Sequence, residues 1–172
     1  VMVEPIGVLG NPRWDPAYPH HLIYFEINND NRLSIMRRDV LTGAVQAVFI
    51  FPPEYQSYLN NQSFDELSRD GRWIAGQGIG ANNWSRIFTV DLVNQTLGAQ
   101  VDPMALYNGP CIADPQWGEV DPDWIGVSPL GNYLVVQWGA EGTGRCEGLE
   151  SYDISNGTYI GHVTAGHPHA DL

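Results

Sequence analysis

Lysine is absent from this sequence. All eight basic residues are arginine, against 20 acidic residues, and the formal net charge is −12. An acidic surface repels phosphate backbones, so the composition disfavours nucleic acid as a partner. The chain also lacks an apolar run long enough to span a bilayer, because the longest one, at 44–53, has the length of a strand. No leader with a basic and then an apolar segment opens the sequence, so we expect any leader of an exported form to have been removed.

Cysteine is scarce: the chain has only Cys111 and Cys146, and neither belongs to a C-x-x-C pair. Both lie in long loops rich in glycine and proline. An even pair in the loops of a β-protein favours a disulfide, which would contribute roughly 3 to 4 kcal/mol in the chain-entropy model. Free buried thiols are the alternative, and the surroundings do not favour a redox role.

The common catalytic signatures are missing as well. The sequence has no G-x-S-x-G, P-loop, H-E-x-x-H or dinucleotide fingerprint. The glycine-rich stretch at 76–80 lies between two predicted strands with no helix after it, which disfavours phosphate binding. No window keeps apolar residues at helical spacing for three turns, so we expect an all-β chain with short strands separated by Gly and Pro.

One pattern is present three times, at 22–51, 72–101 and 132–163. In each copy a polar turn precedes an apolar strand, a second strand ends in Asp39, Asp91 or Asp153, and a further turn leads to a third strand. Repetition of this size is typical of β-propellers, in which each copy is a four-stranded blade. The sequence therefore predicts about three blades, with approximate bounds 12–60, 61–110 and 111–166, and the start of another at 167–172.

Closed propellers typically have four to eight blades, so about three blades leave an open arc. We therefore expect this chain to be one piece of a longer polypeptide, its N-terminal half, contributing to a ring of about six to eight blades. A complete small β-sandwich is the alternative that the length allows.

The turn at Pro12–Pro16, the strand at 22–25 and the segment Asp39–Gly43 resemble the blade pattern of secreted WD40-like or TolB-like propeller proteins. Further copies at 68–73 and 123–129 extend the resemblance over nearly the whole chain. The Gly-His and Trp-Asp dipeptides of typical WD40 repeats are missing. The resemblance implies the fold but no function, because propellers carry many unrelated activities.

The histidines form the one set that could carry chemistry. His167 and His169 are two positions apart, so on an extended strand they share a side, and Asp171 adds a carboxylate. Such a set predicts a site for a divalent metal, Mn or Ca. The H-x-H pair is distantly similar to the manganese site of oligogalacturonate lyases, which implies a metal-dependent polysaccharide lyase. Thr164 stands where that family would have Gln. Because the sequence has no lysine, the base would have to be an arginine or come from the missing part of a longer polypeptide. Hydrogen bonding of these histidines to neighbouring backbone is the alternative.

Oxygen-rich loops are a second candidate for a metal, calcium in this case. One contains Asn28–Asn31, and the other contains Asp114, Glu119, Asp121 and Asp123. The EF-hand spacing is absent, and solvated turns are the favoured interpretation.

Two tryptophans, Trp84 and Trp117, lie in predicted loops, where they could stack on a sugar. The other four are expected to pack between blades: Trp14, Trp73, Trp124 and Trp138.

Four N-x-[ST] sequons, at Asn61, Asn83, Asn94 and Asn156, fall in predicted turns and suggest a secreted, extracellular or periplasmic glycoprotein. Frequent Asn, Ser and Thr in β-turns are an equal alternative. The sequence thus favours an extracellular binding or structural module whose partner is a glycan, a protein surface or a second copy, with no cofactor established. The alternative is the metal-dependent lyase.

Overall fold

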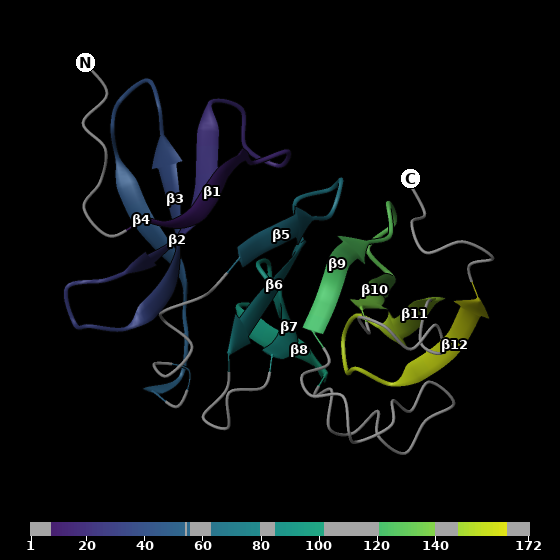
Figure 1. Cartoon of the computed structure of the whole chain (residues 1–172). Helices are drawn as coiled ribbons and strands as arrows, with labels where there is room; N and C mark the ends of the chain where they lie inside the picture. The colour runs from purple at the N-terminus through teal and green to yellow at the C-terminus, as the bar shows by residue number, and fades with distance from the viewer. Residues whose placement is uncertain are drawn as a thin grey trace.

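The computed structural model describes residues 8–53, 55, 63–79, 85–101, 121–139 and 148–164. These residues form three antiparallel sheets of four strands each, and every sheet is built from strands that are consecutive in the chain (Figure 1). This confirms the all-β prediction. Among the described residues there is no helix that could cross a membrane.

The first sheet contains β1 (Val8–Trp14), β2 (His21–Ile27), β3 (Leu33–Asp39) and β4 (Val45–Ile50). The second contains β5 (Ser63–Leu67), β6 (Trp73–Ile79), β7 (Ser85–Asp91) and β8 (Thr96–Val101). The third contains β9 (Asp121–Val127), β10 (Tyr133–Gly139), β11 (Gly148–Asp153) and β12 (Tyr159–Thr164). The predicted blade boundaries near residues 60 and 110 lie outside the described residues.

The three sheets repeat one hydrogen-bonded pattern. In each sheet the first residue of the first turn donates its N–H to the carbonyl of the residue that starts the second strand. These pairs are Asp15 with His21 (2.9 Å), Ser68 with Trp73 (2.8 Å) and Ser128 with Tyr133 (2.9 Å). His21, Trp73 and Tyr133 in turn pair across the sheet with Asp39, Asp91 and Asp153. The predicted alignment of the copies is therefore confirmed, and the first turn of the first sheet is one residue longer than the others.

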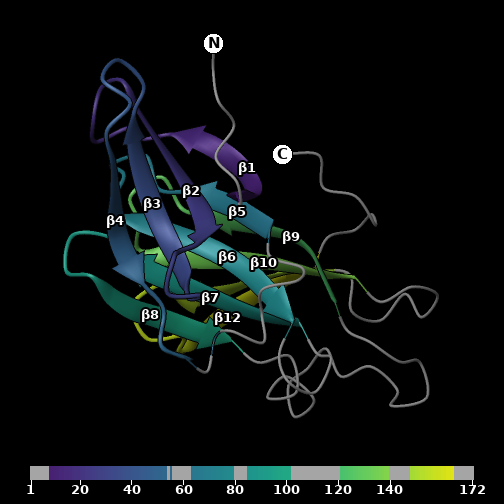
Figure 2. The same ribbon diagram turned by 90° about the vertical axis from the view of Figure 1, so that its left-hand side faces the viewer.

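The sheets fan out from their first strands. The strand β5 contacts both β1 and β9, whereas the later strands of each sheet spread away from this line (Figures 1 and 2). The face of each sheet that looks toward the next sheet in the chain is its forward face, and the opposite face is its backward face. This stacking of successive sheets is the arrangement of propeller blades.

Two hydrophobic cores fill the joints between the sheets. The first core contains Ile23 and Phe25 of β2 together with Ile74 of β6 and Phe88 of β7, and the ring centroids of Phe25 and Phe88 are 6.1 Å apart. In the second core Trp73 and Ala75, on the forward face of β6, meet residues of the third sheet, among them Ile125, Leu134 and Ile154. The middle sheet thus belongs to both cores, because alternate residues of β6 point to opposite sides.

Three expectations were wrong. Pro12–Trp14 was predicted to lie in a turn but forms the end of β1, and Trp14 is 67% exposed instead of buried between described blades. Proline fits here because β1 is the edge strand of its sheet, where a missing N–H breaks no ladder. Asp121 and Asp123 belong to β9 and not to a loop.

Candidate functional site

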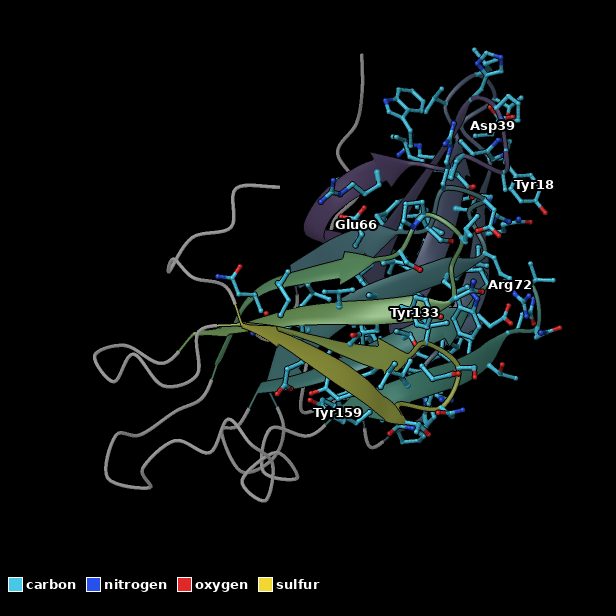
Figure 3. All side chains as sticks on the ribbon, turned by 90° about the vertical axis from the view of Figure 1, so that its right-hand side faces the viewer. Tyr18, Asp39, Glu66, Arg72, Tyr133 and Tyr159 are labelled. Atoms are coloured by element: carbon cyan, nitrogen blue, oxygen red, sulfur yellow. The ribbon has the colours of Figure 1, made fainter. Side chains whose placement is uncertain are left out.

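The turns that connect the strands form one candidate functional surface among the described residues. In each sheet the first turn (β1–β2 and its counterparts) and the second turn (β3–β4 and its counterparts) are joined by a backbone hydrogen bond. The N–H of Val40, Leu92 or Ile154 donates to the carbonyl of His20, Arg72 or Asn132. These six turns make up the turn face, residues 15–20, 40–44, 68–72, 92–95, 128–132 and 154–158. Figure 3 shows Tyr18, Asp39 and Arg72 along the corresponding edge.

A buried ion pair supports the first turn. The Nε of Arg37 donates to Oδ2 of Asp15 at 2.7 Å, and the two side chains are only 7% and 0% exposed. Oδ1 of Asp15 accepts the N–H of Ala17 at 2.9 Å. The guanidinium carbon of Arg37 lies 3.8 Å from the ring centroid of Tyr18, a cation–π contact. The two charges therefore neutralise each other. The ion pair stabilises the shape of the turn, and neither side chain is free to act as an acid or a base.

The second blade has a more open ion pair. Nη2 of Arg72 donates to Oδ2 of Asp91 at 2.6 Å, and the Arg72 side chain is 45% exposed. Oδ1 of Asp91 accepts the N–H groups of Val93 (3.0 Å) and Asn94 (3.1 Å). Burial raises the pKa of Asp91, but the hydrogen bonds from Arg72, Asn94 and Val93 outweigh it, so the net pKa is lowered. The same pair raises the pKa of Arg72.

Asp39 and Asp153 cap the equivalent turns in the other two sheets. Oδ1 of Asp39 accepts the N–H of Leu41 at 2.8 Å, and this hydrogen bond is the main cause of the lowered pKa of Asp39. Oδ1 of Asp153 accepts from the hydroxyl (2.5 Å) and the N–H (2.8 Å) of Ser155, which lowers the pKa of Asp153. All three aspartates are therefore ionised at neutral pH, and they act as turn caps with fixed negative charge.

Large aliphatic side chains project from the tips of these capped turns. Leu41, Val93 and Leu130 are 72%, 71% and 81% exposed. Leu41 and Val93 occupy equivalent positions, two residues after the capping aspartate. Because Val93 belongs to the middle sheet, its exposure persists with a neighbouring sheet on both sides. The turn face thus combines ordered backbone, ionised carboxylates and exposed apolar tips.

Most of the site residues predicted from the sequence lie outside the described residues. They are His167, His169 and Asp171, Cys111 and Cys146, Trp84 and Trp117, and Asn61 and Asn83. His162 lies within β12. In the part of the chain that the structure describes, no group of three or more His, Cys, Asp or Glu side chains could hold a metal ion.

Two of the four sequon asparagines are described, and both are exposed in second turns. Nδ2 of Asn94 donates to Oδ2 of Asp91 at 2.8 Å. Oδ1 of Asn156 accepts the N–H of Thr158 at 2.8 Å. The side-chain amides of Asn94 and Asn156 therefore stabilise their turns, as expected if these asparagines are there for the β-turns. Glycosylation of these asparagines stays a prediction.

The sequence did not reveal the Asp15–Arg37 pair. The available sign was an arginine in the predicted strand that ends at Asp39, because a charge at a core-facing position needs a partner. The partner lies 22 residues earlier, in a segment interpreted only as a turn, so no local spacing connects the two.

Comparisons with known proteins agree on the fold. No protein-family model matches the sequence, and no curated protein sequence matches it. Among solved structures, TolB from Acinetobacter baumannii is 18% identical with a TM-score of 0.51, and the match covers 88% of this chain and 31% of that one. Oligogalacturonate lyase from Vibrio parahaemolyticus is 15% identical with a TM-score of 0.52, and the match covers 88% of this chain and 38% of that one. The chain thus spans about a third of each structure, and the described residues have the β-propeller fold.

Proposed function

We propose that the chain is a non-catalytic binding module that contacts a protein partner through its turn face. The observation that carries the proposal is the set of exposed aliphatic tips, Leu41, Val93 and Leu130. Ordered turns lose little conformational entropy when a partner binds, so contacts made by their tips are effective in binding. Charged residues flank the tips, as they do at the rim of a protein–protein interface.

The charge of the module favours a partner with basic and apolar groups. Asp39, Asp91 and Asp153 are ionised at neutral pH beside these tips, and the whole chain carries −12. Opposite charges increase the association rate and orient the partner. A glycan partner would depend on Trp84 and Trp117, the tryptophans that could stack on a sugar, and both lie outside the described residues.

A peptide display library and a glycan array, probed with the purified chain, test this proposal. The comparison protein carries Leu41→Ser, Val93→Ser and Leu130→Ser, which change exposed tips only. We expect the chain to select basic-apolar peptides, and the triple variant to bind them at least about tenfold more weakly with an unchanged unfolding midpoint. Equal binding by both proteins, or binding to glycans alone, would contradict the proposal.

The metal-dependent polysaccharide lyase stays as the second candidate, supported by the His167-Pro168-His169 pattern. Metal analysis of the purified chain and an assay for unsaturated uronate products test it. Bound Mn or Ca that is lost in a His167→Ala, His169→Ala variant, together with product formation, would favour the lyase. A metal-free chain without product would remove it.

We also propose an extracellular or periplasmic location, which the sequons and the cysteine pair support. Alkylation of Cys111 and Cys146 with and without reductant, followed by mass spectrometry, tests the disulfide. The same mass spectra would reveal glycans on Asn61, Asn83, Asn94 or Asn156. Free thiols and unmodified asparagines in protein purified from the native host would contradict this location.

A further inference from the structure

We propose that Asn156 deamidates spontaneously and that the folded turn between β11 and β12 controls the rate of this modification. Asn156 is exposed and is followed by Gly157. In the reaction the backbone nitrogen of Gly157 bonds to Cγ of Asn156, and the bond from Cγ to Nδ2 breaks. Nδ2 takes the proton of that nitrogen and leaves as ammonia, and water opens the resulting succinimide to aspartate or isoaspartate. This inference goes beyond the proposed binding role of the turn face, because it concerns a covalent change within one of the six turns.

The three second turns are equivalent, but the third alone combines an amide with a following glycine. Three residues after its capping aspartate, the first sheet has Thr42, which carries no amide. The second sheet has Asn94 at this position, followed by Gln95. The side chain of Gln95 hinders the approach of its own backbone nitrogen to Cγ of Asn94, whereas a glycine has no Cβ to do so. Asn156 is therefore the reactive asparagine of these turns.

Hydrogen bonds in the closed turn restrain both reacting groups. The N–H of Gly157 donates to the carbonyl of Asp153 at 2.8 Å. This hydrogen bond must break when the nitrogen attacks, because the attack removes the proton. Oδ1 of Asn156 accepts the N–H of Thr158 at 2.8 Å, and this bond fixes the side-chain amide. We therefore expect deamidation to require local opening of the turn, which does not require unfolding of the whole sheet.

The closed turn needs the same glycine that makes the open turn reactive. Gly157 has a φ of 75°, in the left-handed region that residues with a Cβ rarely adopt. A Cβ at this position would also lie 3.4 Å from the backbone nitrogen of Gln100 in the second blade. A larger residue would slow the attack on Asn156, but it would strain the folded turn. The fold and the reactivity therefore depend on one residue.

The products do not restore the original turn, which directly precedes Tyr159 (Figure 3). Isoaspartate adds a methylene to the backbone between Asp153 and Thr158, and the N–H of Asp153 donates to the carbonyl of Thr158 at 2.8 Å. Aspartate instead places a second carboxylate in the turn that Asp153 caps. A glycan on Nδ2 of Asn156 would block the release of ammonia, so deamidation and glycosylation of this residue exclude each other.

Peptide mapping by mass spectrometry tests the proposal on the full, glycan-free chain, incubated in mildly alkaline buffer with and without denaturing urea. We expect Asn156 to deamidate at least about tenfold more slowly in buffer than in urea, because only the open fraction reacts. Asn94 should keep its amide over the same time in both. Asp153→Ala removes the carboxylate that accepts from Ser155, and should raise the rate in buffer at least about threefold. Asp39→Ala, the same change in the first sheet, is the control and should leave the rate at Asn156 unchanged.

The wild-type chain in urea below its unfolding midpoint gives a measurement that needs no folded variant. The rate at Asn156 should rise there while circular dichroism still shows the folded state, because the turn opens locally. A rate that rises only with global unfolding, or equal rates in buffer and in denaturing urea, would overturn control by the turn. Loss of the Asn94 amide as fast as that of Asn156 in urea would overturn the role of Gly157.

Discussion

Gly98, in the second blade, lies close against the third blade. A Cβ at this position would lie 2.5 Å from Oγ1 of Thr89 and 2.6 Å from the carbonyl oxygen of Ile154. The Ile154 carbonyl also accepts hydrogen bonds from the Thr89 hydroxyl and the Ala99 N–H, so it cannot move away without losing both. We therefore expect Gly98→Ala to lower the free energy of unfolding by about 1 to 3 kcal/mol, measured by urea denaturation.

Gly161 provides the matched control, because it lies in the last strand of the third sheet as Gly98 lies in that of the second. A Cβ on Gly161 would meet nothing within 4 Å. Gly161→Ala should change the free energy of unfolding by less than about 0.5 kcal/mol. Equal effects of the two substitutions would show that contact between blades is not what requires glycine at Gly98.

The Asp15–Arg37 pair makes a second prediction for single residues. Asp15→Ala leaves the Arg37 guanidinium buried without its carboxylate, and breaking a buried pair in this way costs about 3 to 5 kcal/mol. Arg72→Ala removes a partner that is 45% exposed and should cause a much smaller loss. Urea denaturation at neutral pH compares them, and a larger loss for Arg72→Ala would contradict this assignment of roles.

The three capping aspartates make the stability of the fold depend on pH in the acid range. Their pKa values lie below the usual 3.8, so each carboxylate stabilises the fold fully above about pH 4, and this stabilisation is lost as the pH falls through the lowered pKa. Asn can accept the same hydrogen bonds but does not ionise. The double variant Asp39→Asn, Asp153→Asn should therefore unfold more easily than the wild type at pH 7.

This difference between the double variant and the wild type should vanish as the pH approaches 2, because protonation removes the charge from the wild-type carboxyls too. Thermal unfolding followed by circular dichroism between pH 7 and pH 2 measures both curves. Asp30→Asn, in the turn between β2 and β3, removes one carboxylate charge elsewhere and is the control. A difference that is constant across the pH range would contradict the assigned role of the two caps.

Sequence reasoning predicted the elements unevenly. The second, third and fourth strands of each sheet have apolar cores and follow recognisable turns, so β2, β6 and β10 lie where the repeats placed them. The first strand of each sheet was not located, because β1, β5 and β9 precede the three repeat copies. At the end of β1, Pro12 normally marks a turn, and only its edge position allows it in a strand. The proximity of the six turns could not be predicted, because it depends on how the blades stack.

The candidate site was less predictable than the fold. The sequence identified Asp39, Asp91 and Asp153 as the ends of strands but not as caps with lowered pKa values, since these depend on hydrogen bonds formed only in the folded turns. It drew attention to His167 and His169 instead, and their metal site stays a prediction. The exposed tips have no sequence signature, because Leu and Val are equally common in cores.

The middle sheet belongs to both cores, and this determines the order in which the sheets unfold. Phe88 of β7 is held by the first sheet, and Trp73 of β6 by the third. Unfolding of either outer sheet exposes one side of the middle sheet and leaves the other side buried. The middle sheet, in contrast, cannot unfold without disrupting both cores. Unfolding should therefore begin in the first or the third sheet, and the amide protons of β6 and β7 should be the last to exchange with solvent.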